Sequence, residues 1–281
     1  MSLDGIEAFL SGEDAESIKQ RLKVVRDTGM YSVVLLAVSE AGKPEPVGSG
    51  TLVSVNATHY VLTARHVWER RLKLSPTVGI TLRTGAGHKL LLDRRAVVPF
   101  GPPCPTPETE VGPDLVFLRI PDFYVGTVEA YGGVFYNLSI PESSVPATER
   151  LETWFLLGAP ASLAALSDNH ASMELRGSEV AVSTPQIDGG SDFLDARTNV
   201  ADLPSHKSLG GVSGGGLWKV LLYETPQGAV DSIALLRGVA FWQFPPESNH
   251  RVVRCHSVDK IRAAAEQLCY DAALTPIEVL S

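Results

Sequence analysis

Short apolar runs, separated by turn-forming residues, dominate this chain from residue 31 onward. Val33 to Val38 is apolar and rich in β-branched residues, which is the pattern of a buried strand. Similar runs predict strands at Thr51–Val55, Tyr60–Ala64, Gly79–Arg83, Lys89–Val98, Leu115–Ile120, Gly133–Leu138, Glu152–Leu157, Ser172–Val182, Gly216–Leu222, Ile233–Trp242 and Arg251–Cys255. Two successive sets of such runs predict an all-β fold of two six-stranded antiparallel β-barrels.

Helical patterns occur near the two ends of the chain. Residues Ala15 to Thr28 place apolar side chains at helical spacing among charges, which predicts an amphipathic helix outside the barrels. Val258 to Leu268 is rich in helix formers, with Ser257 as the expected N-cap. The predicted organisation is an N-terminal helical extension (1–30), a first barrel (31–130), a second barrel (131–257) and a C-terminal helix and tail (258–281).

Two stretches lack any regular pattern. The segment from Pro99 to Pro113 is dense in proline, and the segment from Gln186 to Ser208 is rich in Gly, Asp, Asn, Ser and Pro. These compositions predict a surface loop and a long irregular loop, respectively.

Composition narrows the class of protein. Among 281 residues, 44% are hydrophobic and the net charge is −8, which argues against binding to nucleic acid or acidic membranes. Cys104, Cys255 and Cys269 are odd in number and lack metal-ligand spacing, so we expect free thiols in a reducing compartment. The acidic N-terminus is unlike a signal peptide, and no apolar run is long enough to span a bilayer. The expected location is therefore cytoplasmic, with no membrane partner.

One glycine-rich stretch carries candidate chemistry. Gly211-Val212-Ser213-Gly214-Gly215 places a hydroxyl between glycines, which allow the backbone N–H groups to approach a substrate carbonyl. Upstream, His66 ends an apolar strand, and Asp114 precedes another. A serine hydroxyl needs a base to become a nucleophile, and a histidine needs an orienting carboxylate, so these three residue types together indicate acyl transfer.

Four segments resemble the chymotrypsin/trypsin-like serine protease superfamily, most closely its disulfide-free bacterial members such as the high-temperature-requirement group. They are Gly48–Val53 leading into Leu62–Val67, Asp114–Arg119, Gly211–Gly215 and, more weakly, Gly238–Trp242. The order His66, Asp114, Ser213 is that of the family. The resemblance implies a chymotrypsin-like pair of barrels, the first carrying His66 and Asp114 and the second carrying Ser213.

The resemblance also implies a role for each residue. His66 would be the general base, Asp114 would orient it, and Ser213 would be the nucleophile of a serine endopeptidase that forms an acyl-enzyme. The N–H groups of Gly211 and Ser213 would form the oxyanion hole. The polypeptide substrate would contact two further segments, one before the nucleophile and one on a later strand: His206, Lys207, Ala240, Phe241 and Trp242. No metal or organic cofactor is implied.

The chain departs from the family pattern at two positions. Val212 replaces an acidic or amide residue, which argues against activation by a newly freed N-terminus. Arg65 replaces a small residue next to His66, and its charge must point away from the base so as not to disfavour the imidazolium. The other histidines are expected in loops or at the surface: His59, His88, His170, His206, His250 and His256.

Two other functions are compatible with parts of the sequence. One is a protease-like fold that binds peptides or proteins with little or no cleavage. The other is an α/β-hydrolase, because Gly211–Gly215 also fits Gly-x-Ser-x-Gly, and Asp231 is followed by His250 and His256. That motif requires a buried strand before the serine and a helix after it, whereas residues 205–210 are polar and Gly216–Leu222 has the pattern of a strand. The specific substrate and the oligomeric state are not encoded in any motif.

Overall fold

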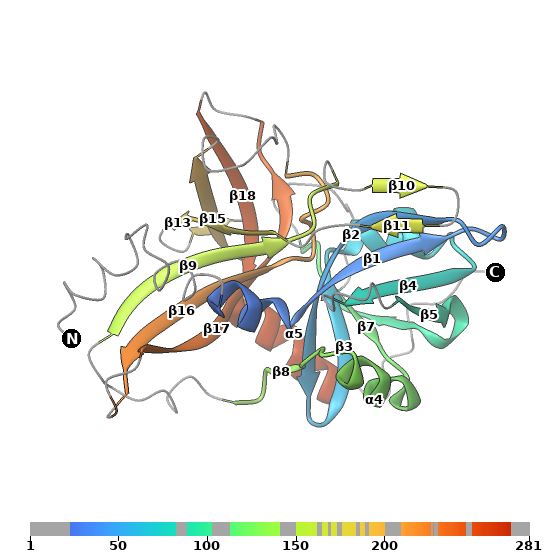
Figure 1. Ribbon diagram of the computed structural model, residues 1–281, viewed down its shortest axis with the longest axis horizontal. Helices are drawn as coiled ribbons and strands as arrows, with labels where there is room; N and C mark the ends of the chain where they lie inside the picture. Colours follow the sequence, from blue (N-terminus) through green and yellow to red (C-terminus); the bar gives the residue numbers. More distant parts are fainter. Residues whose placement is uncertain are drawn as a thin grey trace.

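The computed structural model describes residues 23–82, 89–102, 113–140, 150–161, 165–167, 170–172, 176–183, 186–188, 191–199, 209–225, 227, 230–245 and 249–270. Within these ranges the chain forms two curled antiparallel sheets, joined by a shared apolar core. Figure 1 shows the first sheet in blue to green on the right and the second in yellow to red on the left. The predicted all-β, two-barrel class is confirmed.

The first sheet contains eight strands, two more than the predicted barrel. The order is β5-β4-β1-β2-β3-β7-β6, and β8 adds to β2 in parallel. The strands are β1 (Ser32–Val38), β2 (Pro44–Val55), β3 (Thr58–Thr63), β4 (Thr77–Leu82), β5 (Lys89–Asp93), β6 (Val98–Phe100), β7 (Val116–Arg119) and β8 (Tyr136–Asn137).

The second sheet also contains eight strands, in the order β12-β9-β16-β17-β18-β15-β13, with β14 paired to β15. They are β9 (Arg150–Gly158), β12 (Arg176–Glu179), β13 (Ala181–Val182), β14 (Gln186–Asp188), β15 (Ser191–Asn199), β16 (Gly216–Glu224), β17 (Val230–Gln243) and β18 (His250–Ser257). A separate hairpin joins β10 (Ala165–Ser167) to β11 (His170–Ser172).

Strands of both sheets bury their apolar side chains in one cluster. Leu62 and Phe117 of the first sheet pack there with Trp218 and Val239 of the second, and all four are fully buried. Tyr31 stacks on Trp218 with ring centroids 5.0 Å apart. Burial of large apolar side chains is the main favourable term in folding, so this cluster fixes the two sheets against each other.

The helices are short. The chain after β3 turns through α3 (Arg65–Val67) into a π-helical segment, η1 (Trp68–Leu72), and η2 (Arg94–Ala96) is a 3₁₀ turn. Helix α4 (Asp122–Ala130) follows β7, and α5 (Val258–Tyr270) follows β18. The predicted C-terminal helix and its cap are confirmed, because the backbone N–H of Lys260 donates to Ser257 Oγ at 3.2 Å. None of the helices in the described ranges is both long and apolar enough to cross a bilayer.

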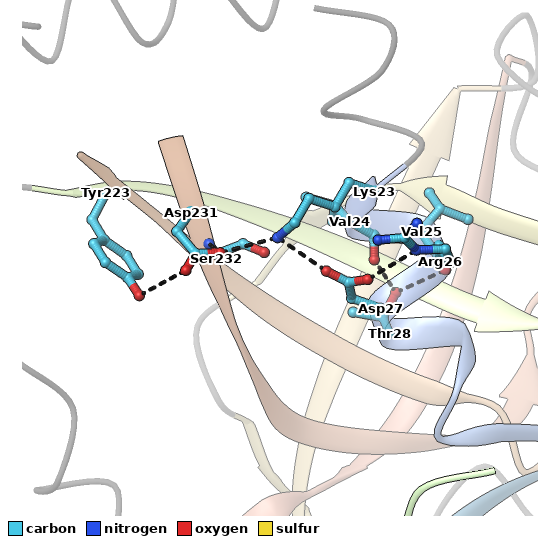
Figure 2. A network of polar contacts seen from close by, with 9 residues as sticks. All are labelled: Lys23, Val24, Val25, Arg26, Asp27, Thr28, Tyr223, Asp231 and Ser232. Carbon is cyan, nitrogen blue, oxygen red and sulfur yellow. Dashed lines mark hydrogen bonds and ion pairs between the residues drawn. The ribbon is translucent and has the colours of Figure 1, made fainter. Parts of the chain in front are cut away.

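Residues 23–29 are helical and belong to the predicted N-terminal helix, whose earlier part lies outside the described residues. Figure 2 shows how this helix contacts the second sheet: Lys23 Nζ lies 3.0 Å from Asp231 on β17 and 3.1 Å from Asp27. The pKa of Lys23 is raised because these two carboxylates outweigh the opposing effect of burial, and the Lys23 hydrogen bond lowers the pKa of Asp231. The ion pairs are partly exposed, so the burial of Val24 contributes more to docking.

The expected irregular loop from Gln186 to Ser208 is wrong over its first part. Residues Gln186–Asp188 and Ser191–Asn199 form β14 and β15, and β15 pairs along its length with β18. Polar and glycine-rich composition disfavours a strand in isolation, but pairing with a buried neighbour overrides that preference. Residues 200–208 lie outside the described part of the chain.

Candidate active site

His66 and Asp114 form a tightly coupled pair. Asp114 accepts two hydrogen bonds from His66, one from the backbone N–H at 2.9 Å and one from Nδ1 at 2.5 Å. The Asp114 side chain is 1% exposed and that of His66 is 23% exposed. A proton held on Nδ1 leaves the lone pair of Nε2 free on the accessible side of the ring, as a general base requires.

Arg65 lies next to this base but is directed away from it. Its guanidinium donates to the carbonyl of Pro102 at 2.5 Å and lies 3.9 Å from the Glu69 carboxylate. The side chain is buried, so these contacts fix its direction. The guanidinium contacts that the structure shows are therefore with Pro102 and Glu69 and not with the His66 ring.

Ser213 lies in a tight turn that precedes β16. The N–H of Gly215 donates to the carbonyl of Val212 at 2.7 Å, and the N–H of Gly214 donates to Ala240 of β17 at 2.7 Å. Gly211 and Gly214 have positive φ angles of 94° and 90°, which side chains with a Cβ rarely adopt. A strand follows the serine directly, so the strand-turn-helix of an α/β-hydrolase is absent at this described position.

The two peptide groups that would bind an oxyanion are held in a fixed orientation. The carbonyl of Gly210 accepts the N–H of Ala161 at 2.6 Å, and the carbonyl of Val212 accepts that of Gly215. Because a trans peptide points its N–H opposite to its carbonyl, these bonds turn the N–H groups of Gly211 and Ser213 the other way. Neither N–H has a hydrogen-bond partner among the described residues, so both donors are available to a ligand.

The side chain of Val212, which lies between these two peptides, is held by apolar packing. Its side chain is 4% exposed and packs in an apolar cluster with Leu156 and Leu209. A Cβ placed on Gly158 would come within 2.7 Å of it, so the strand backbone approaches Val212 closely. Burial of this side chain holds the turn without an ion pair at this position.

Strand β2 brings the serine turn to the histidine. Ser49 Oγ accepts the N–H of Ala159 and donates to the carbonyl of Gly211, each at 2.8 Å. The N–H of Ser49 donates to the carbonyl of Ser213 at 2.8 Å, and its own carbonyl accepts Thr63 Oγ1 at 2.7 Å. Ser49 thus links the turn to the strand that leads directly into His66.

Gly48, on the same strand, lies where the turn of Ser213 meets the segment that contains His66. A Cβ placed there would lie 2.9 Å from Val67, the residue after His66, and 3.3 Å from the carbonyl of Ser213. The structure therefore places the turn of Ser213 next to the segment that carries the His66–Asp114 pair. The hydrogen bond from Ser213 Oγ to His66 Nε2 is not formed in this arrangement, and such bonds often shorten only when substrate is present.

The segment predicted to contact substrate lies at the end of β17. Pairing of β17 with β16 ends at Val239, and beyond Ala240 that edge has no strand partner among the described residues. Strand addition by an extended peptide uses an edge of this kind. Phe241 does not contribute its side chain, because it is 1% exposed and packed in the core. Trp242 is half-buried against the same core.

A pocket of about 480 Å³ lies near the end of this strand, against β13, β15 and β18. Phe244 follows β17 and lines the pocket, and Arg254 lies at its wall, where its Nε and Nη2 donate to Asp195 at 2.9 and 3.1 Å. Neither Ala240 nor Trp242 lines it. His206 and Lys207, the other predicted substrate residues, lie outside the described residues.

Two residues of this site were not predicted from the sequence. Ser49 belongs to the Gly48–Val53 motif, but the sequence pattern assigns it no role of its own. Its position between two glycines indicates a close backbone approach. His256 was expected at the surface, and this is wrong: it is fully buried on β18, and its Nε2 accepts the N–H of Asp114 at 3.0 Å. Cys255 is a free, buried thiol whose pKa is raised by desolvation. In the described residues, no group of three or more His, Cys, Asp or Glu side chains is arranged to hold a metal ion.

The fold and the site define an all-β protein of two curled sheets with a histidine–aspartate pair and a glycine-bounded serine where the sheets meet. No protein-family model matches this sequence, and no curated protein matches it significantly. One similar solved chain comes from a study in which aromatic interactions drive the coupled folding and binding of the intrinsically disordered Sesbania mosaic virus VPg protein. It is 13% identical, and the match covers 87% of this chain and 92% of that chain with a TM-score of 0.41. This likeness supports no conclusion about function.

Proposed function

We propose that this protein is a serine endopeptidase of the chymotrypsin/trypsin-like superfamily. One observation carries the proposal: the N–H groups of Gly211 and Ser213, which have no partner in the described part of the chain, lie in a turn next to the segment of the coupled His66–Asp114 pair. An acyl-transfer site requires a nucleophile, a base with an oriented lone pair and donors for the developing oxyanion.

The reaction follows from these parts. His66 Nε2 takes the proton of Ser213 as Oγ attacks the carbonyl carbon of a peptide bond. The N–H groups of Gly211 and Ser213 stabilise the tetrahedral oxyanion. The imidazolium, stabilised by Asp114, returns its proton to the leaving amine, and water then hydrolyses the acyl-enzyme by the same route.

The first test is covalent labelling of the folded protein with a fluorophosphonate probe, followed by cleavage of a peptide library. Labelling of the wild type should disappear in S213A and in H66A. Turnover should fall by roughly 10⁶-fold in these variants and by about 10⁴-fold in D114N. The matched control is S139A, which removes an exposed serine hydroxyl just after β8 of the first sheet and should label normally.

The alternative function is a binding module built on the same fold. No hydrogen bond joins Ser213 Oγ to His66 in this structure, and this observation favours a direct test of the binding module. A folded wild type that is not labelled, but captures library peptides as well as the S213A variant does, would support the binding module and refute the endopeptidase.

A further inference from the structure

His256 occupies an unusual place behind the candidate triad. It lies on β18 of the second sheet, whereas Asp114 precedes β7 of the first. The ring is fully buried and stacks on Phe241, with centroids 4.0 Å apart and planes at 15°. Phe193 covers it further, at 5.8 Å. The side chain is therefore held in one orientation by aromatic packing.

The ring acts as a hydrogen-bond acceptor. The backbone N–H of Asp114 donates to Nε2 at 3.0 Å, so Nε2 must carry a lone pair and the ring proton must reside on Nδ1. Nδ1 is buried and has no hydrogen-bond partner among the described residues. A buried donor without a partner is unfavourable. If the His256 ring served only for packing, an apolar ring would fill the same place without this cost.

We propose that His256 is a positioning residue of the triad, which holds the Asp114 backbone so that its carboxylate faces His66. This inference rests on the proposed function. Asp114 must receive two hydrogen bonds from His66 at once, from the backbone N–H and from Nδ1. Both hydrogen bonds require that the Asp114 carboxylate has a fixed position. The hydrogen bond from the Asp114 N–H to His256, which lies on the opposite sheet, fixes the backbone that carries this carboxylate.

The charge state of His256 suits this role at neutral pH. Desolvation lowers its pKa to about 4, against the opposing effects of the Asp114 charge and of the hydrogen bond with the Asp114 backbone, while Lys260 on α5 lowers it further. The neighbouring rings of Phe193 and Phe241 carry no charge. A neutral ring accepts the Asp114 N–H, whereas a protonated ring would place a second donor against it.

The test compares three variants of the full chain. H256F keeps a stacked ring but removes the acceptor. H256Q loses the ring but places an amide oxygen near the position of Nε2, and H59F is the matched control. His59 packs on Phe135 at 4.5 Å on the first sheet and lies outside the proposed machinery. Two quantities are measured: the rate of fluorophosphonate inactivation and the downfield proton NMR signal of His66 Nδ1–H bonded to Asp114.

H256F should lower the inactivation rate by about 10- to 100-fold, which is less than the roughly 10⁴-fold loss for replacing the acid itself. The His66 proton signal should move upfield or broaden. H256Q should recover part of the rate and of the signal, and H59F should match the wild type in both. If H256F keeps a normal His66 signal, the positioning role is refuted even when inactivation is slower. The slower rate would then come from a structural defect that leaves the hydrogen bond between His66 and Asp114 intact.

The two proposals fail in different ways. A wild type that is not labelled, but whose His66 signal is lost in H256F, refutes the endopeptidase and supports the positioning role. A labelled wild type whose rate and signal are unchanged in H256F supports the endopeptidase and refutes the positioning role. If H256F does not fold, H256Q and H256N are compared instead. Only glutamine is long enough to reach the Asp114 N–H, so equal signals in these two variants would refute the inference.

Discussion

Replacement of Ser49 by alanine tests how the serine turn is held. The Ser49 hydroxyl bridges the N–H of Ala159 and the carbonyl of Gly211, with both distances at 2.8 Å and the residue fully buried. A buried hydrogen bond contributes about 0.5–1.5 kcal/mol net, so loss of two should lower the free energy of unfolding by about 1–3 kcal/mol. Chemical denaturation measures this directly.

The same change should slow the proposed chemistry. Without the Ser49 hydroxyl, the carbonyl of Gly211 is released and the adjacent oxyanion donor shifts. Complete loss of one such donor reduces turnover by about 10²–10³-fold, so a displaced donor should cost about 10- to 100-fold in the fluorophosphonate inactivation rate. Substrate affinity should change little, because the hydrogen bond from the oxyanion donor acts mainly in the transition state.

The matched control is S75A. Ser75 is also a buried serine, whose hydroxyl donates to the carbonyl of Val38 at 2.6 Å, but it lies in the bend before β4, away from the site. It should lose comparable stability and keep full reactivity. If S49A and S75A lose stability equally and S49A reacts within twofold of the wild type, the hydroxyl does not position the turn and the reasoning is refuted.

Two further predictions concern the same region. G214A should be destabilised by more than about 3 kcal/mol, because φ is 90° and a Cβ would overlap the carbonyl of Ser49 and the hydroxyl of Thr63; thermal unfolding measures this, and a stable G214A would contradict the turn geometry. Stability should also fall with acidity through His256, whose pKa is about 4 when folded and 6.5 in the unfolded chain. The unfolded state then binds more protons below pH 6.5, so about 3 kcal/mol present above that pH should be lost by pH 4. Urea unfolding at several pH values should show this loss in the wild type and not in H256F.

Local patterning was sufficient for the elements whose neighbours in sequence explain them. The apolar β-branched runs predict most strands, and the cap at Ser257 predicts α5, because these signals depend on a few consecutive residues. The glycines around Ser213 likewise predict a turn with positive φ, which the structure has at Gly211 and Gly214. In contrast, the composition of β15 predicts a loop, since only its pairing with β18 makes it a strand.

The site shows the same division. Motif order indicated His66, Asp114 and Ser213, and the structure pairs the first two and places the turn of the third next to their segment. The sequence contained no signal that His256, 142 residues from Asp114 in the chain, accepts its N–H. Nor did it show that Phe241 packs inward on that ring instead of facing a substrate.

What the sequence alone determined is therefore the all-β class, the residue types of the proposed acyl-transfer site and the glycines that allow the backbone to turn. What only the tertiary structure decided is orientation. Hydrogen bonds from Ala161 and Gly215 select which way the two oxyanion peptides face, and packing on Phe241 selects which ring nitrogen of His256 meets Asp114. These choices depend on contacts between residues far apart in the chain, so no local pattern can encode them.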